Sequence, residues 1–316
     1  MTTQDRRIAM ITGGNSGIGL AAASKLAGKG FHVILASRDQ HKSALALDRI
    51  RAAHPGASVE SISLDLASFA AIRQCAAAFQ AKGLPLHLLI NHAGGSFPGR
   101  QARFTADGFE LTFGTNHLGH FLLTHLLLDH LRRSAPARVI TVSSQLHIPG
   151  YAGGPRPDFD YDNLKAEKYY NAQVFYKNAK LANIMFAYEL QRRLDGSGVT
   201  SNAVCPGFVP ESIAERRKSP VERWLYRDVL ARMPFARSLE QASASYLFVA
   251  TDPRYASTGG KFIVDGKEIP SSNESYDEEK ARRLWDLSYQ WCGLAATLPR
   301  SNPHPPPVGA QRCLHE

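Results

Sequence analysis

Cysteine is scarce in this sequence, and long apolar runs are missing. The four cysteines form no C-x-x-C pair and no metal-like spacing with histidine, which argues against a disulfide framework and against a metal site. They are Cys75, Cys205, Cys292 and Cys313. No window of about 18 apolar residues predicts a membrane-spanning helix. No basic leader with a long apolar core precedes the first apolar run, so we expect a cytoplasmic protein.

Acidic side chains are outnumbered by basic ones, 28 against 37, and the formal net charge is +9. Such an excess favours anionic ligands in general. The basic residues are dispersed, apart from a triplet at 216–218, and no helix-turn-helix, zinc or aromatic-basic signature accompanies them. We therefore expect no nucleic acid among the partners.

Apolar runs of strand length recur along the chain, and segments of helical periodicity lie between them. The runs cover residues 8–13, 32–37, 58–65, 87–91, 138–144, 199–207 and 261–266. The periodic segments cover residues 17–29, 39–53, 68–82, 105–132, 174–194 and 239–250. Strands that alternate with helices, and that are apolar almost throughout, predict a parallel sheet covered on both faces. The predicted class is α/β: a single-domain, doubly wound Rossmann fold with a mostly parallel seven-stranded sheet and helices on both faces.

One domain is predicted over residues 1–298, because no linker-like stretch interrupts it. Residues 208–238 mix aromatic and apolar side chains with arginines, as expected of a helix pair that forms a lid over a substrate. Residues 299–316 are rich in proline and lack an apolar period, which predicts a disordered tail that carries no chemistry.

A glycine-rich turn follows the first predicted strand. The sequence TGGNSGIG begins at Thr12 and places Gly13, Gly14, Gly17 and Gly19 at the mouth of a helix. A strand, a glycine turn and a helix N-terminus direct backbone N–H groups and the positive end of the helix dipole at a pyrophosphate. The strict G-x-G-x-x-G spacing is absent, but the position of the turn still predicts a dinucleotide site.

This turn and three later motifs resemble the short-chain dehydrogenase/reductase family. The motifs are Thr12-Gly13-x-x-x-Gly17-x-Gly19, NHAG from Asn91, NHLGHF from Asn116 and PG at Pro206, in the family's order. The resemblance covers about residues 7–295, and NHLGHFLLT, KLANI and RRLWDLS are most similar to the retinol dehydrogenase-like branch. It implies cofactor contacts at Gly13, Asn15, Ser16, Gly17, Ile18, Gly19, Arg38, Asp65, Leu66, Asn91, Ala93, Gly94, Tyr176, Lys180, Pro206, Gly207 and Val209.

The end of the second predicted strand selects the nicotinamide cofactor. A small residue, Ser37, followed by Arg38 leaves room and a guanidinium for the 2′-phosphate of NADP(H). In the alternative reading Asp39 holds the ribose, although Asp39 also suits the N-cap of the next helix. Asp65 has the same two interpretations, an adenine contact by resemblance or a helix cap.

Three Tyr-x-x-x-Lys pairs occur, at Tyr161, Tyr176 and Tyr276. On a helix this spacing brings the two side chains together, and an ammonium lowers the pKa of a phenol toward neutrality. Prolines and glycines surround Tyr161 and deny it a helix, while Tyr276 follows the last strand, away from the central crevice. Tyr176 is predicted to open a long amphipathic helix just after a serine-bearing strand.

The resemblance assigns roles around Tyr176. Tyr176 is the proton donor or base, and Lys180 lowers its pKa and holds the nicotinamide ribose. Ser144, rather than Ser143, hydrogen-bonds the substrate oxygen. Asn116 carries a water that relays protons to Lys180, and as an asparagine inside a helix it also fits a kink. His117, His120 and His125 are interpreted as packed or surface imidazoles, because their spacing suits no metal.

The sequence departs from the family pattern at three places. An insertion at residues 145–175 widens one wall of the substrate site, Ser212 replaces the usual threonine after the PG motif, and Ala179 replaces a serine before the lysine.

We expect an NADP(H)-dependent carbonyl reductase or alcohol dehydrogenase acting on a bulky hydrophobic or aromatic ketone, aldehyde or alcohol. The alternatives are a non-catalytic nucleotide-binding sensor or scaffold, and an epimerase or dehydratase that uses the cofactor transiently. By resemblance, the helices at 105–132 and 174–194 pair in a homodimer or homotetramer.

Overall fold

The computed structural model describes residues 6–294 except 158, 216 and 218. The predicted tail at 299–316 and Cys313 lie outside the described residues. The other three cysteines are free and buried. Within the described ranges, no helix combines the length and the apolar character that crossing a membrane requires.

The sheet has eight strands, in the order β3-β2-β1-β4-β5-β6-β7-β8. They are β1 (Ile8–Thr12), β2 (His32–Ser37), β3 (Val59–Ser63), β4 (Leu88–Asn91), β5 (Ala137–Val142), β6 (Val199–Cys205), β7 (Phe262–Val264) and β8 (Lys267–Glu268). The first seven are parallel, as predicted. The eighth was missed: β8 pairs antiparallel to β7 across Asp265 and Gly266, which both have positive φ. An Asp-Gly pair with that backbone favours a tight hairpin.

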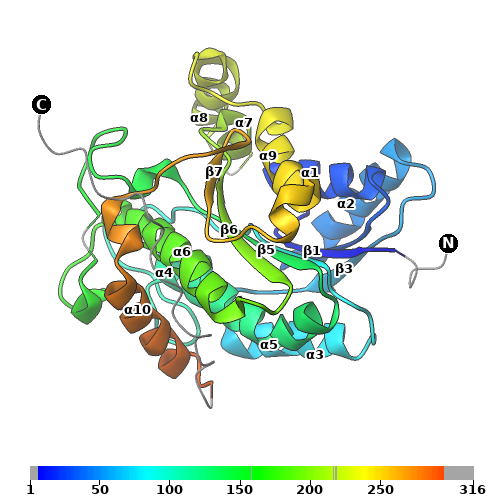
Figure 1. The fold of residues 1–316 in the computed structure, drawn as a ribbon. Helices are drawn as coiled ribbons and strands as arrows, with labels where there is room; N and C mark the ends of the chain where they lie inside the picture. Colours follow the sequence, from blue (N-terminus) through cyan, green and yellow to red (C-terminus); the bar gives the residue numbers. More distant parts are fainter. Residues whose placement is uncertain (1–5, 158, 216, 218, 295–316) are drawn as a thin grey trace, which may run out of the picture.

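Helices cover both faces of the sheet, which confirms the doubly wound prediction (Figure 1). One face carries α1 (Gly17–Gly28), α2 (Gln40–Ala53) and α9 (Leu239–Thr251). The opposite face carries α3 (Phe69–Gln80), α5 (Gly119–Arg133) and α6 (Ala172–Leu194). Short 3-10 turns occur at η3 (Gln145–His147), η4 (Tyr161–Asn163), η7 (Pro253–Ala256) and η8 (Asn273–Tyr276). Each face therefore closes over its own apolar core.

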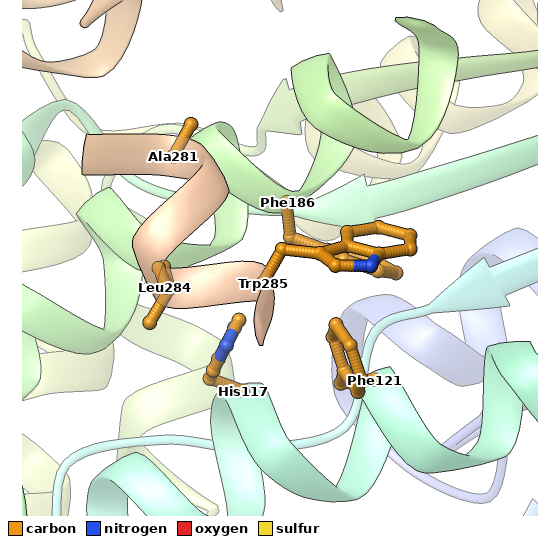
Figure 2. Close-up of a pocket in the computed structure, with 6 residues that line it drawn as sticks. All are labelled: His117, Phe121, Phe186, Ala281, Leu284 and Trp285. Carbon is orange, nitrogen blue, oxygen red and sulfur yellow. The ribbon is translucent and has the colours of Figure 1, made fainter. Parts of the chain in front are cut away.

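The last helix, α10 (Glu278–Trp291), packs outside α5 and α6. Its Trp285 is 1% exposed, and the indole contacts the rings of Phe121 and Phe186 at centroid distances of 5.1 and 5.9 Å. Figure 2 shows these side chains directed toward one another, beside His117 and Leu284. The space among them is too small for a water molecule. Consequently α10 belongs to the core, and the α5 and α6 surface beneath it is not open.

Three predicted boundaries were wrong. The helix expected from residue 105 begins at Leu111, because a β-bridge between Phe104 and Glu110 occupies the preceding residues. It then runs through α4 (Leu111–Phe113) and the π-helix η2 (Gly114–Leu118) into α5. Tyr176 does not open its helix, since Asn171 accepts hydrogen bonds from two backbone N–H groups and starts α6 at Ala172. The expected lid pair is instead four short pieces, α7 (Pro210–Ala214), α8 (Pro220–Trp224), η5 (Leu225–Val229) and η6 (Leu230–Arg232).

Candidate active site

The predicted site residues lie beyond the carboxyl ends of the parallel strands, and those around Tyr176 and the glycine turn follow β1, β4, β5 and β6. These strands are neighbours in the sheet, and the chain reverses its strand order between β1 and β4. In open α/β sheets, ligands bind in the crevice at such a reversal. The site is therefore where the topology alone would place it.

Tyr176 and Lys180 lie one turn apart on α6. The Lys180 ammonium is 5.6 Å from the centre of the Tyr176 ring, and its Nζ donates a hydrogen bond to the carbonyl of Val142 at 3.1 Å. Asn183 donates to the same carbonyl at 3.0 Å. Because Val142 ends β5, these bonds tie the α6 pair to the carboxyl end of this strand. Lys180 is 5% exposed, whereas Tyr176 is half-buried.

The two serines after β5 have different tasks. Ser143 is buried and donates its hydroxyl to the backbone carbonyl of Lys180 at 2.6 Å. Ser144 is partly exposed, and its Oγ accepts a long hydrogen bond of 3.3 Å from the N–H of Leu146. Ser143 therefore joins β5 to α6, and the geometry favours Ser144 as the serine that meets a substrate.

Asn116 lies in the π-helix η2, the kink that its position inside a helix suggested. Its side-chain oxygen accepts from the N–H of Gly95 at 3.0 Å, and its amide donates to the carbonyls of Gly95 and Thr112 at 2.9 and 2.7 Å. Single-turn π-helices are frequent at functional sites. Here the kink lets one side chain hold the loop that follows β4.

His120 and Thr12 form a buried link that the sequence analysis missed. His120 Nδ1 lies 3.0 Å from the main-chain oxygen of Asn116 and must donate to it, because a carbonyl only accepts. Its Nε2 lies 2.8 Å from the hydroxyl of Thr12, which accepts from the N–H groups of His92 and Ala93. Burial lowers the pKa of His120 to about 4, so the neutral ring accepts the Thr12 proton. The only available signal was the second histidine of NHLGHF.

The two other Tyr-x-x-x-Lys pairs do not form. The Tyr161 hydroxyl donates to the carbonyl of Lys280 at 2.8 Å, and Lys165 lies over the ring of Phe109. The Lys280 ammonium pairs with Glu274 at 2.9 Å. The same spacing therefore gives three different arrangements. Of the three pairs, only Tyr176 and Lys180 lie close together.

The glycine turn fits a dinucleotide. Gly13 and Gly17 have positive φ, and a Cβ at Gly19 would collide with the carbonyl oxygen of Gly13. Ser16 precedes α1 as its N-cap, and its side chain makes no capping hydrogen bond among the described residues. Ile18 is buried beneath the turn. A close backbone turn with an uncapped helix start is the arrangement that accommodates a pyrophosphate.

The loop after β4 packs closely against the glycine turn. A Cβ at Gly13 would lie 3.1 Å from Ala93, and a Cβ at Gly94 would collide with the Asn116 amide. Asn91 is fully buried and donates to Thr124 at 2.9 Å, in keeping with a structural hydrogen-bonding role beside the cofactor.

The end of β2 leaves Arg38 exposed, while the neighbouring Ser37 is buried and bonded to Ser43. Asp39 accepts from the N–H of Lys42 at 3.0 Å and is the N-cap of α2, as its second interpretation predicted. Asn15 donates to the Asp39 carbonyl and joins the glycine turn to α2.

Asp65 does not cap α3, whose N-cap is Ser68. It accepts instead from the N–H of Ala67 at 3.0 Å, within the turn after β3. Leu66 is buried against α5, where its carbonyl oxygen would lie 2.8 Å from a Cβ at Gly119.

The segment after β6 reaches over the glycine turn. Pro206 and Gly207 turn the chain with positive φ at Gly207, and buried Val209 precedes α7. Ser212, on α7, brings its hydroxyl within 2.8 Å of the place a Cβ of Gly17 would occupy. This places Ser212 beside the glycine turn.

Lys177 is a second residue that sequence reasoning missed. It is 4% exposed, and its Nζ donates to the carbonyls of Gly153 and Pro155 at 2.9 and 2.8 Å. The insertion at 145–175 is thereby anchored next to Tyr176 on α6. A lysine beside a Tyr-x-x-x-Lys pair carries no sequence signal for this role.

Burial holds three histidines of η2 and α5 neutral, which confirms the packed alternative of the prediction rather than the surface one. Burial lowers the pKa of His117 to about 3, and the pKa values of His120 and His125 to about 4. The His125 ring packs among Phe121, Trp285 and Tyr289. Within the described residues its Nε2 has no hydrogen-bond partner. These rings are therefore protonated at a lower pH in the folded protein than in the unfolded chain.

We predict that acid destabilises the protein through these rings. Between their usual pKa of 6.5 and about 4 the unfolded chain binds more protons, so the free energy of unfolding falls as the pH drops through that window. Each ring should cost about 2 kcal/mol between pH 7 and about pH 5. Denaturant titrations at the two pH values should show that His125→Phe loses about 2 kcal/mol less than the wild type. Phe186→Leu, in the same cluster, should lower the free energy of unfolding by the same amount at both pH values. An unchanged acid loss in His125→Phe would contradict the assignment.

Known proteins are similar to this chain in sequence and in fold. Residues 7–155 match the short chain dehydrogenase family. Retinol dehydrogenase 11 of Mus musculus is 40% identical over 288 residues, covering 91% of this chain and 87% of that protein. A crystal structure of a protein from Mycobacterium paratuberculosis superposes with a TM-score of 0.70 at 30% identity, covering 95% of this chain and 99% of that one. The NADP active-site complex of Pseudomonas aeruginosa RhlG gives 0.63 at 26% identity, covering 84% and 97%.

Proposed function

Because the chain belongs to the short-chain dehydrogenase/reductase family, we propose that it is an NADP(H)-dependent enzyme that interconverts a bulky apolar ketone or aldehyde and its alcohol. Family membership makes it an oxidoreductase that acts on CH–OH or C=O groups with a nicotinamide cofactor. The observation that carries the proposal is the α6 pair, Tyr176 and Lys180, tied to the end of β5 beside Ser144.

The bound nicotinamide would supply or accept the hydride. Tyr176 donates its phenolic proton to the carbonyl oxygen during reduction and takes a proton from the alcohol in the reverse direction. Lys180 stabilises the negative charge that builds on the phenol oxygen. Ser144 donates a hydrogen bond to the substrate oxygen as charge develops there.

Asn116 serves this proposal mainly as a positioning residue. Its side chain holds Gly95, and its main-chain oxygen already accepts from His120. A carbonyl oxygen has two lone pairs. The water relay to Lys180 that the resemblance assigns to Asn116 would therefore use the second lone pair.

The preference for NADP(H) rests on Arg38. Its exposed guanidinium follows a small residue at the end of β2, and Asp39 is committed to capping α2. A guanidinium binds a phosphate through charge-assisted hydrogen bonds, whereas a ribose hydroxyl would need an acidic partner. The structurally similar RhlG complex contains NADP, which supports the same preference.

Initial rates over retinoid, steroid, quinone and polyketide carbonyls test the function and the cofactor together. We predict turnover with NADPH in preference to NADH. Arg38→Ala should lower kcat/KM for NADPH by roughly 10- to 100-fold, because a hydrogen bond to a charged group is lost, and should leave NADH nearly unaffected. Lys42→Ala, which removes an exposed cation nearby, is the matched control.

Three outcomes would reject parts of the proposal. Equal use of both cofactors by the wild type would remove the NADP assignment. Binding of NADPH without turnover on any carbonyl would indicate a sensor or scaffold. Product formation without net NADPH consumption would indicate an epimerase or dehydratase.

The proposed substrate class rests on a relative, and the proposed lid rests on the position of α7. One relative is a retinol dehydrogenase, which makes a retinoid-like or other hydrophobic alcohol or carbonyl the first choice. We assign the lid role to the segment nearest the site, residues 208–214, because α7 already lies against Gly17.

A homodimer or homotetramer remains a proposal with one structural constraint. α10 covers the surface of α5 and α6 through which the resemblance predicts pairing. The outer side of α10 is charged and exposed, with Glu279, Arg282 and Arg283. Interface cores are depleted of charged residues. Pairing on this side would therefore bury a surface poorly suited to it.

A further inference from the structure

A short segment beyond α7 concentrates exposed apolar side chains. Of the ten large hydrophobic residues that are exposed in the described part of the chain, five lie between Pro220 and Phe235. They are Val221 (72% exposed), Trp224 (56%), Leu225 (40%), Met233 (39%) and Phe235 (61%). We call residues 219–237 the apolar arm. Single exposed hydrophobic residues are normal, but a cluster on one segment marks an interaction surface.

The apolar arm packs very little against the rest of the protein. None of the residues of α8, η5 and η6 is buried. The arm contacts α7 chiefly through η5, and its C-terminal end is held by the ring contact of Phe208 with Phe235 and the ion pair of Arg237 with Asp265. Figure 1 shows α8 projecting at the edge of the molecule, on the opposite side from α10. Short helices in water usually need a packed apolar face. The exposed apolar side chains of the arm are therefore suited to contact with a partner outside the chain.

The charges of the arm indicate what the cover is. Its four arginines outnumber its two acidic residues, Glu222 and Asp228, and one of the four, Arg237, pairs with Asp265 outside the arm. Arg227 pairs with Asp228, while Arg223 and Arg232 are exposed. Trp224 and Leu225, on consecutive helical turns beside Arg223, and Phe235, in the turn after η6, are the residue types found in elements that lie in the interface of a lipid bilayer. A second copy of the arm would bring like charges together, which argues against self-pairing.

We propose that the apolar arm docks on an anionic lipid surface. Trp224, Leu225 and Phe235 enter the headgroup region, and Arg223 and Arg232 contact lipid phosphates. The arm continues from α7, which lies against the glycine turn. If the proposed function holds, docking also brings the substrate side of the site close to the phase in which an apolar carbonyl dissolves.

Vesicle flotation without substrate or cofactor tests the proposal independently of the enzymatic activity. The wild type should float with phosphatidylcholine vesicles that contain phosphatidylserine, float less without phosphatidylserine, and dissociate at high salt. The double variant Trp224→Ser with Leu225→Ser should bind at least tenfold more weakly, because two apolar side chains no longer enter the interface. Arg223→Gln with Arg232→Gln should lose chiefly the preference for anionic vesicles.

Leu45→Ser and Phe104→Ser are the matched controls, because these side chains are 48% and 54% exposed outside the arm. Their binding should equal that of the wild type. A wild type that stays in solution, or controls that lose as much binding as the arm variants, would overturn the proposal. Dimerisation abolished by the arm substitutions without any vesicle binding would assign the face to a second copy. A raised KM for a soluble carbonyl, again without vesicle binding, would assign it to the lid.

Discussion

Tyr176→Phe should lower kcat for carbonyl reduction by roughly 10²- to 10⁴-fold, the usual contribution of a positioned general acid. The substitution removes only the phenolic oxygen, and the ring remains next to Lys180. NADPH affinity should change little, because the backbone of the glycine turn and Arg38 supply most of the proposed cofactor contacts. Single-turnover rates of NADPH oxidation, beside a fluorescence titration of NADPH, separate the two effects.

The chain contains its own controls for this variant. Tyr161→Phe and Tyr276→Phe remove phenols that have the same Tyr-x-x-x-Lys spacing but contact Lys280 and Ser271 instead of the site. Both should keep turnover within about threefold of the wild type, since these phenols are remote from the reacting atoms. Wild-type turnover in Tyr176→Phe, or an equal loss in all three variants, would exclude Tyr176 as the proton donor.

Gly19→Ala should weaken NADPH binding by at least about 100-fold and lower the free energy of unfolding by about 1–3 kcal/mol, because the added methyl overpacks a backbone turn. Its Cβ would collide with the carbonyl oxygen of Gly13 and lie 2.9 Å from the His92 ring. The turn has to open, and opening it moves the backbone groups that meet the pyrophosphate. Fluorescence titration with NADPH and denaturant unfolding measure the two losses.

Gly99→Ala is the matched control for Gly19→Ala. Gly99 is exposed, and the nearest atom to its added Cβ would be the carbonyl oxygen of Gln101, at an ordinary 3.5 Å. It should leave NADPH affinity and stability unchanged. NADPH affinity in Gly19→Ala within twofold of the wild type would remove the glycine turn from the cofactor site.

Much of the fold could be read from local patterns. The seven parallel strands and the helices between them follow from apolar runs and helical periodicity, which neighbouring residues determine by themselves. The cap at Asp39 was predictable for the same reason, because a helix start is decided within four residues. The helical period failed at residue 105, where a competing local turn, closed by the bridge of Phe104 with Glu110, delays the helix.

The candidate site divides in the same way. Context along the chain was enough to prefer Tyr176 over Tyr161 and Tyr276, and the structure shows that only Tyr176 meets its lysine. The proton-transfer role of Tyr176 itself stays a prediction. The supports of the site were not visible in the sequence, because Lys177 and His120 act through carbonyls and hydroxyls of residues far from them in the chain.

The sequence by itself determined the α/β class and the family, and it singled out the glycine turn and Tyr176 as candidates, because each depends on residue types at short spacing. The tertiary structure alone decided that α10 closes the α5 and α6 surface, that His120 joins Thr12 to Asn116, and that the apolar arm is left without a cover. The physical reason is the range of the interactions. Periodicity and capping act within a few residues, whereas burial and these hydrogen bonds depend on which distant segments the fold brings into contact.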